Sequence, residues 1–228
     1  MIKKIKDWIL KKGVVIVNYS NDLDARNIER KMQKEALNDT VNFVKKNMMH
    51  TSSFADRFSL IEYSLTFVKT GLFMEFGVFK GKTINFIASK TDQTVYGFDS
   101  FEGLPEDWRE GFRKGTFRLE KIPIFRENVK IIEGWFEDTL PNFILENTGD
   151  CSFIHIDCDL YSSTKTIFDH IKTRIKSGCV IVFDEFFNYP GWQHGEYKAF
   201  MEFVEKNNIK FEYIGYCRYH SQVAVRIL

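Results

Sequence analysis

The sequence lacks an excess of charge of either sign, and it lacks a long apolar run. Its 32 Lys and Arg residues nearly balance its 31 Asp and Glu residues, which gives a formal net charge of +1. Proteins that bind nucleic acid usually present a strongly basic face, so this balance argues against a nucleic-acid partner. No apolar stretch approaches the roughly 20 residues of a membrane span. Asp7, Lys11 and Lys12 interrupt the apolar positions that a signal peptide would need, so we expect neither a membrane span nor export.

Cysteine is scarce, and two familiar glycine motifs are missing. None of the four cysteines forms a C-x-x-C pair, so we expect free thiols in a reducing, cytoplasmic compartment rather than disulfides or a zinc site. The chain has no G-x-G-x-x-G dinucleotide fingerprint, and its G-K-T triplet at 81–83 lacks the earlier glycine of a phosphate-binding P-loop. Both of these nucleotide-binding motifs are therefore excluded.

The composition indicates one domain with an N-terminal helical extension. Hydrophobic residues make up 44% of the 228 residues and charged residues 28%, so a core of ordinary size can form. Spaced apolar positions predict an exposed amphipathic helix over 22–50 and a second helix over 53–69. Ile2, Ile5, Trp8 and Ile9 fall on one helical face, which we expect to pack on the domain or on a second subunit of a homodimer. We assign residues 1–70 to this extension, as part of a binding pocket, a lid or an oligomer contact.

From residue 72 onward, short apolar runs alternate with helical stretches. The runs are LFMEFGV, TVYGFDS, VKIIEGW, SFIHIDCDL, CVIVFDE, FEYIGY and QVAVRIL. Buried strands that alternate with helices predict βαβ units and a parallel sheet. The last two runs are too close together for a parallel crossover, so they predict an antiparallel hairpin. For residues 71–228 we therefore expect an α/β, Rossmann-like fold, in which helices flank a mostly parallel seven-stranded sheet that ends in this C-terminal hairpin.

The end of the first run is rich in glycine. Ligands of open α/β sheets bind beyond the carboxyl ends of the strands, and this end contains Glu75, Gly77, Gly81, Lys82 and Thr83. Gly77 and Gly81 let the backbone turn sharply and approach a ligand, and Thr83 is placed to help cap the helix that follows. This segment is a candidate cofactor-binding turn.

The next two strand ends carry further candidate cofactor contacts. Asp99, followed by Ser100, ends the second run. A carboxylate offers two acceptor oxygens, so Asp99 is suited to accept both ribose hydroxyls of a nucleoside. Gly134, Trp135 and Phe136 follow the third run, and an aromatic ring beside a glycine suits the flat face of an adenine. Capping or turn formation by Asp99 and core packing of Trp135 are the structural alternatives.

Four carboxylates gather at the ends of the fourth and fifth runs. Asp157 and Asp159 lie in HIDCDL, and Asp184 and Glu185 lie in VFDEF, on strands expected to be adjacent. Alternate side chains of an extended strand point the same way, so Asp157 and Asp159 should face one site. Such carboxylates repel one another unless a cation or protons intervene, and oxygen ligands favour Mg²⁺, Mn²⁺ or Ca²⁺. The sequence therefore predicts a divalent-metal site here.

These strand ends, taken as a set, resemble a known family. The segments EFGVFKGKT, YGFDSFEGLPEDW, EGWFEDTLP, IHIDCDLYSST and VFDEF resemble the macrocin O-methyltransferase family of class I S-adenosylmethionine (SAM)-dependent methyltransferases, which includes macrolide- and novobiocin-sugar O-methyltransferases. The resemblance implies Mg²⁺-dependent transfer of a methyl group from SAM to a sugar hydroxyl. The family's metal ligands match Asp157, Asp184 and Glu185, and its proposed general base matches Asp159. The family often has Asp-Asp where this chain has Asp184-Glu185, so the longer Glu185 side chain can bind the metal differently or only through water.

Two other functions fit parts of the pattern. Asp157-Cys158-Asp159 matches the D-x-D motif with which metal-dependent glycosyltransferases hold a sugar nucleotide. That interpretation leaves Glu75 to Thr83 and Asp99 unexplained. A methyltransferase-fold interaction protein without activity should carry damaged motifs, whereas these are intact. The sequence leaves the hydroxyl acceptor open among a glycan, a nucleotide sugar and a natural-product glycoside.

Overall fold

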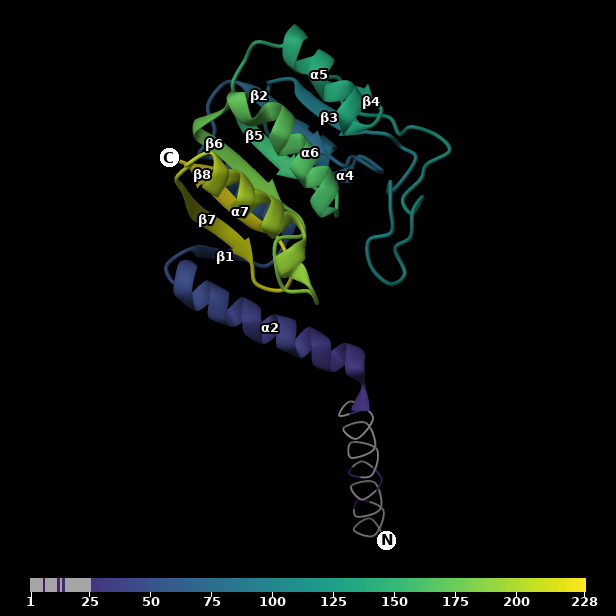
Figure 1. Cartoon of the computed structure of the whole chain (residues 1–228), viewed down its shortest axis with the longest axis vertical. Helices are drawn as coiled ribbons and strands as arrows, with labels where there is room; N and C mark the ends of the chain where they lie inside the picture. Colours follow the sequence, from purple (N-terminus) through teal and green to yellow (C-terminus); the bar gives the residue numbers. More distant parts are fainter. Residues whose placement is uncertain (1–5, 7–11, 13, 15–25) are drawn as a thin grey trace.

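The computed structural model describes residues 6, 12, 14 and 26–228. The predicted helical face of Ile2, Ile5, Trp8 and Ile9 lies outside these residues. The described residues form an eight-stranded sheet with helices on both faces (Figure 1). This arrangement confirms the predicted α/β architecture.

The sheet is mostly parallel, as the alternating pattern predicted. Its strands are β1 (Ser52–Phe54), β2 (Leu72–Phe76), β3 (Val95–Asp99), β4 (Val129–Glu133), β5 (Cys151–Ile156), β6 (Ile175–Phe183), β7 (Phe211–Cys217) and β8 (Val223–Ile227). Their order is β1-β7-β8-β6-β5-β2-β3-β4, and β8 alone runs antiparallel to its neighbours β6 and β7. The carboxyl ends of β2 to β6 therefore meet at one edge, where the residues that follow them can share a site.

Helices cover both faces of the sheet. They are α2 (Ile28–Asn47), α3 (Arg57–Leu65), α4 (Lys82–Ala88), α5 (Phe136–Glu146), α6 (Tyr161–Ile171) and α7 (Glu196–Lys206). Helices α5, α6 and α7 pack on one face, over a core that includes Phe76, Phe98 and Phe183. Helices α3 and α4 cover the other face, where Ile61 and Ile84 are completely buried. Burial of this apolar surface is the main favourable contribution to such a layered fold.

The sheet has one strand more than the seven that were predicted, because residues 52–54 are extended rather than helical. They form β1, which pairs in parallel with β7. Helix α3 begins only at Arg57, since Asp56 Oδ1 accepts hydrogen bonds from the backbone N–H groups of Phe58 and Ser59, both at 3.0 Å. A three-residue edge strand is too short to show a period of two, so the helix predicted over 53–69 was wrong at its start.

Helix α2 lies beside the sheet edge formed by β1 and β7 and is mostly exposed (Figure 1). It contacts the loop after β6 through Thr40, whose Oγ1 accepts a hydrogen bond from Asn188 N–H at 3.0 Å. Phe43 packs edge-on against Trp192 in the same region. No helix among the described residues is long and apolar enough to cross a membrane.

All four cysteines are free and buried. Cys151, Cys179 and Cys217 lie on β5, β6 and β7, and Cys158 lies in the loop after β5. The prediction of free thiols is therefore confirmed. Burial raises the pKa of Cys151 to about 12, which keeps this thiol protonated at neutral pH.

Candidate functional site

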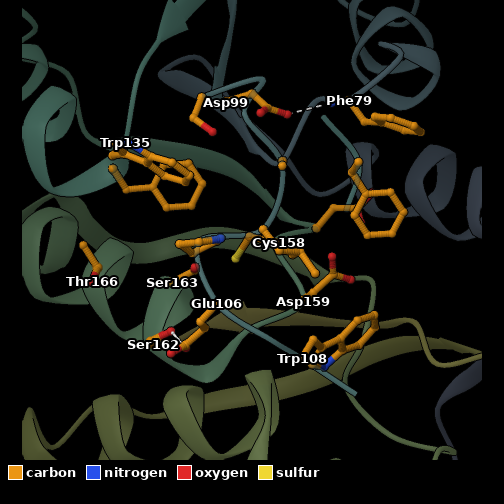
Figure 2. A pocket seen from close by; sticks show the side chains of 18 of the residues that line it. Phe79, Asp99, Glu106, Trp108, Trp135, Cys158, Asp159, Ser162, Ser163 and Thr166 are labelled. Carbon is orange, nitrogen blue, oxygen red and sulfur yellow. Dashed lines mark hydrogen bonds between the residues drawn. The ribbon is translucent and has the colours of Figure 1, made fainter. Parts of the chain in front are cut away.

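A cavity of about 720 Å³ lies at the carboxyl edge of the parallel strands (Figure 2). Residues after β2, β3 and β4 line one half, acidic residues after β5 and β6 line the other, and the loop over 100–128 forms a wall. Most of the predicted site residues line it, namely Gly77, Asp99, Ser100, Gly134, Trp135, Phe136, Asp157, Asp159, Asp184 and Glu185. One cavity thus joins the candidate cofactor turn to the candidate metal site.

Gly77 allows the two halves to meet. Its backbone has a φ of +91°, and a Cβ atom there would lie 1.7 Å from the carbonyl oxygen of Asp157. Gly77 N–H donates to Phe98 O at 3.0 Å, and Asp157 N–H donates to Phe76 O at 2.8 Å. Only glycine fits this position, because any side chain would push the turn after β2 away from the loop after β5.

Asp99, predicted to accept both ribose hydroxyls, also holds the turn after β2 in place. Its Oδ2 accepts a hydrogen bond from Val78 N–H at 2.8 Å. The same oxygen accepts one from Phe79 N–H at 2.7 Å (Figure 2). Its Oδ1 accepts one from Phe101 N–H at 2.7 Å. A carboxylate offers about four lone-pair sites, so one site on Oδ1 is left for a ligand hydroxyl. The geometry supports one ribose contact to this carboxylate rather than two.

Trp135 presents a ring to the cavity at the N-terminus of α5. It is half-buried and packs against no other aromatic ring among residues 26–228. Gly134, with a φ of +136°, precedes it and donates its N–H to Asp99 O at 3.0 Å. Phe136 packs edge-on against Phe76 in the core. The Trp135 ring is therefore available to cover a flat ligand, as predicted for an adenine.

Four residues of the candidate cofactor turn lie outside the lining of the cavity, namely Glu75, Gly81, Lys82 and Thr83. Lys82 extends its Nζ over the ring of Phe58, at 5.1 Å from the centroid. Gly81 is the N-cap of α4 and is left-handed, and no side chain caps this helix. The predicted capping role of Thr83 is therefore wrong, because Thr83 already lies inside the helix, where its side chain is buried.

Beneath the cavity, Glu75 and His155 form a completely buried pair. His155 Nδ1 lies 3.1 Å from Glu75 Oε2, and His155 Nε2 lies 4.0 Å from Asp184 Oδ1 without a hydrogen-bond partner. Burial raises the pKa of Glu75, and the hydrogen bond from His155 opposes this effect. Burial acts to lower the pKa of His155, but the hydrogen bond and charge of Glu75 outweigh it and raise that pKa. Glu75 therefore orients a histidine that faces the acidic residues.

The acidic residues form two overlapping groups of potential metal ligands. Asp157, Asp159 and Glu185 can bring one oxygen each within 4.8 Å of one another, and Asp157 and Asp184 do so with His155. Burial, followed by repulsion from Asp184, raises the pKa values of Asp157 and Glu185 well above the ordinary range. Glu185 Oε2 is buried without a hydrogen-bond partner. This oxygen-rich, mutually repelling set fits a hard divalent cation.

Arg57 also reaches this cluster, a contact that the sequence analysis missed. Its Nη1 lies 3.2 Å from Asp184 Oδ1 and 3.6 Å from Asp157 Oδ2. Gln222 Nε2 donates to the same Asp184 Oδ1 at 3.2 Å. Arg57 comes from α3, far upstream in the sequence, and nothing in its local pattern marked it. One oxygen of each aspartate is thus already engaged by protein, which leaves the other for a ligand.

Asp159 joins the cluster for a different reason from the one predicted. Strand β5 ends at Ile156, so Asp157 and Asp159 are not alternate residues of one strand. Asp159 has a left-handed φ of +64°, and this turn brings its largely buried carboxylate into the cavity (Figure 2). Burial and repulsion by Asp184 raise the pKa of Asp159 to about 7, although the charge of Arg109 acts to lower it. A carboxylate of this kind can exchange a proton near neutral pH.

Glu196 supports the acidic loop after β6 and was not predicted. It is completely buried at the start of α7, and its Oε2 accepts a hydrogen bond from Glu185 N–H at 3.1 Å. Among the described residues, its Oε1 has no hydrogen-bond partner. Burial raises the pKa of Glu196 well above its usual range, and the charge of Asp159 acts in the same direction. Glu196 therefore fixes the backbone of Glu185 and adds one more carboxylate to the acidic group.

The loop over 100–128 covers the acidic side of the cavity with apolar surface. Trp108, Phe112 and Phe117 line this wall, and the rings of Phe112 and Phe117 are 5.7 Å apart. Glu106 Oε1 accepts a hydrogen bond from the Ser162 hydroxyl at 2.5 Å, which ties the loop to α6 (Figure 2). The wall therefore keeps water from part of the space beside Asp159.

Comparison with protein families shows what the central part of the chain resembles. Residues 74–186 match a family model described as a methyltransferase domain. This part of the chain is therefore similar to a methyltransferase domain. The match runs from β2 to the loop after β6, so it contains the glycine turn, Asp99 and all four acidic residues.

Known relatives and solved structures are also methyltransferases. The chain is 25% identical over 169 residues to the 8-demethyl-8-(2,3-dimethoxy-alpha-L-rhamnosyl)-tetracenomycin-C 4'-O-methyltransferase of Streptomyces olivaceus, which covers 61% of this chain and 64% of the relative. It is 24% identical over 136 residues to the demethyldecarbamoylnovobiocin O-methyltransferase of Streptomyces niveus. That alignment covers 50% of this chain and 51% of the relative. The chain therefore matches less than two thirds of either relative.

Two solved structures share the fold. A calicheamicin methyltransferase superposes with a TM-score of 0.59 at 20% identity, over 74% of this chain and 76% of that chain. The O-methyltransferase NovP superposes with a TM-score of 0.57 at 22% identity, over 75% of this chain and 78% of that chain. The family model and the two sequence relatives favour the methyltransferase interpretation over the glycosyltransferase one.

Proposed function

We propose that this protein transfers a methyl group from SAM to a hydroxyl group of a sugar, with the help of a divalent cation such as Mg²⁺. The observation that carries the proposal is that one cavity contains both the turn built by Gly77 and Asp99 and the acidic cluster with Asp159. One relative is named for a rhamnosyl tetracenomycin, which supports a glycoside acceptor. The free, buried thiols support a cytoplasmic site of action.

The residues of the cavity divide the work of this reaction. Gly77, Asp99 and Trp135 would hold SAM, with the free lone pair of Asp99 Oδ1 accepting a ribose hydroxyl and the Trp135 ring covering the adenine. Asp159 would accept the proton of the acceptor hydroxyl on a carboxylate oxygen, a contribution of roughly 10²–10⁴-fold for a placed base. The aromatic wall would exclude water while the two substrates are held in line.

The acidic cluster would hold the cation. Asp157, Asp184 and Glu185 would supply the oxygen ligands. Asp157 belongs to both groups of potential ligands, Asp184 to the group with His155, and Glu185 to the group with Asp159. Among the described residues Glu185 Oε2 has no hydrogen-bond partner, which supports a direct contact from this longer side chain. When bound, a divalent cation lowers the pKa of a hydroxyl group that coordinates it. Glu196 would hold the backbone of Glu185 in place through its hydrogen bond to Glu185 N–H. In this proposal Asp159 accepts the proton, and the other three carboxylates of the cluster bind the cation.

The proposal can be tested by measuring transfer from radiolabelled SAM to a panel of glycosides. We expect transfer to be lost in EDTA and restored by Mg²⁺, and Asp157→Asn to lower it strongly. Asp150→Asn, at the opposite end of β5, is the matched control and should behave as the wild type. Full turnover by metal-free protein in chelator would assign the acidic cluster another role.

A further inference from the structure

The loop over 100–128 carries an arginine that forms no ion pair with the described residues. Arg109 lines the cavity. Among the described residues, no carboxylate lies within the ion-pair distance of 4.0 Å of its guanidinium, and its side chain donates no hydrogen bond to them. A guanidinium has five donors and no acceptor, and it keeps its charge at any physiological pH. A permanent cation that faces a cavity without a partner is suited to meet an anion there.

Aromatic rings hold this guanidinium in place. Its Cζ lies 3.8 Å from the centroid of the Trp108 ring, 4.9 Å from that of Phe112 and 5.5 Å from that of Tyr189. The segment is a tight turn, in which Trp108 N–H donates to Phe112 O at 2.9 Å and Phe112 N–H donates to Arg109 O at 2.8 Å. The three rings restrict the guanidinium, and its N–H groups donate no hydrogen bond to the described part of the chain. This arrangement lowers the ordering cost of binding a planar or tetrahedral oxyanion.

The charges around the cavity favour binding of an anion beside Arg109. The carboxylates that line the acceptor half repel an anion; they include Asp157, Asp159, Asp184, Glu185 and Glu106. Arg57 is already paired with two of these carboxylates. Arg109 is close enough to Asp159 for its charge to act on that carboxylate, so a group bound by Arg109 would belong to a molecule beside the proposed base.

We propose that Arg109 and its surrounding rings form a subsite for an oxyanion of the acceptor, so that the acceptor is a charged sugar rather than a neutral one. The oxyanion is a phosphate, as in a nucleotide sugar, or a carboxylate, as in a uronic acid. This inference rests on the proposed function and narrows its acceptor. Aromatic rings beside the guanidinium also suit the apolar face of the sugar ring.

Calorimetry with three probes that share one sugar ring tests this subsite. UDP-glucose, glucuronate and methyl glucoside are titrated into the full chain with Mg²⁺, with and without saturating S-adenosylhomocysteine. We expect at least one of the two anionic probes to bind about 10-fold or more tightly than methyl glucoside, the scale of charged hydrogen bonds. Comparing UDP-glucose with glucuronate then distinguishes phosphate from carboxylate.

Variants assign the preference to Arg109. Arg109→Met keeps an apolar chain on the rings but removes the charge, so it should abolish the preference, and Arg109→Lys should keep part of it. Arg113→Met, an exposed arginine of the same loop outside the cavity, should leave it unchanged. Equal binding of charged and neutral probes, or an Arg109→Met variant that keeps the preference, would overturn the inference. Binding of S-adenosylhomocysteine, recorded first, tests the proposed function separately.

Discussion

Arg57 Nη1 lies 3.2 Å from Asp184 Oδ1, inside the cluster of carboxylates proposed to hold a cation. The same nitrogen lies 3.6 Å from Asp157 Oδ2. The guanidinium therefore neutralises part of the charge that a divalent cation would meet. Because like charges repel at this range, Arg57 should stabilise the metal-free cluster and weaken cation binding.

Replacing Arg57 tests this competition. Arg57→Met should lower the Tm of the metal-free protein, since Asp157 and Asp184 lose their counter-charge, and should enlarge the rise in Tm that Mg²⁺ causes. Thermal melts with EDTA and with Mg²⁺ measure both effects. Lys90→Met, which breaks an exposed pair with Glu62, is the control and should change little. Weaker Mg²⁺ stabilisation of Arg57→Met would mean that Arg57 orients the ligands instead.

Removing the carboxylate of Asp99 should weaken S-adenosylhomocysteine binding. Three backbone N–H groups lose their acceptor in Asp99→Ala, a loss of about 1–3 kcal/mol for groups left unpaired. Binding should fall by about 10-fold or more because the turn after β2 is no longer held open for the ligand. Asp92→Ala, in the exposed turn before β3, is the control. Unchanged affinity of Asp99→Ala in calorimetry would remove Asp99 from the cofactor site.

The metal-free protein should lose stability as the pH rises. Burial and repulsion by Asp184 raise the pKa of Asp159 to about 7, and the pKa values of Asp157 and Glu185 are raised in the same direction. The folded chain thus keeps protons that the unfolded chain, with ordinary carboxyl pKa values of about 4, has lost. Stability from these groups is fully present below about pH 4 and declines as pH rises through 7.

Thermal melts in EDTA from acid to slightly alkaline pH measure this decline. Asp159→Asn should flatten part of the slope, because the amide does not titrate. Added Mg²⁺ should flatten it further, since a cation stabilises the ionised carboxylates. A Tm that increases steadily over this range would contradict the repulsion between these groups.

The base is tested by Asp159→Asn, which keeps the shape of the side chain but cannot accept a proton. Transfer from SAM to whichever glycoside the wild type methylates should fall by roughly 10²-fold or more. Affinity for S-adenosylhomocysteine and Mg²⁺ should stay close to that of the wild type. Near-normal transfer would exclude Asp159 as the base, and loss of Mg²⁺ binding would make it a metal ligand.

The sequence alone predicted the features that depend on local pattern. Alternating apolar runs predicted the parallel strands, and the residues that follow them, such as Gly77, Asp99 and Asp184, do meet at one edge. Strand β1 was not predicted, because three extended residues are too few to show a period of two. Asp157 and Asp159 were placed together correctly, but the cause is a left-handed turn at Asp159 rather than strand alternation.

Contacts between distant segments could not be predicted from one sequence. Arg57 lies in α3 and contacts the loops after β5 and β6, and Glu196 begins α7 and contacts the loop after β6. Neither residue belongs to a motif, and their positions depend on how the helices pack on the sheet. The three hydrogen bonds from backbone N–H groups to the Asp99 carboxylate could not be predicted either, because they depend on the course of the turn after β2.

The most direct test of the central claim is a calorimetric titration of the wild-type protein with S-adenosylhomocysteine. This measurement needs no knowledge of the acceptor. The account predicts saturable binding of one molecule per chain, because the turn after β2, the free lone pair of Asp99 and the Trp135 ring share one cavity. Absence of any binding to folded protein, with or without Mg²⁺, would contradict the proposal that this domain is a SAM-dependent methyltransferase.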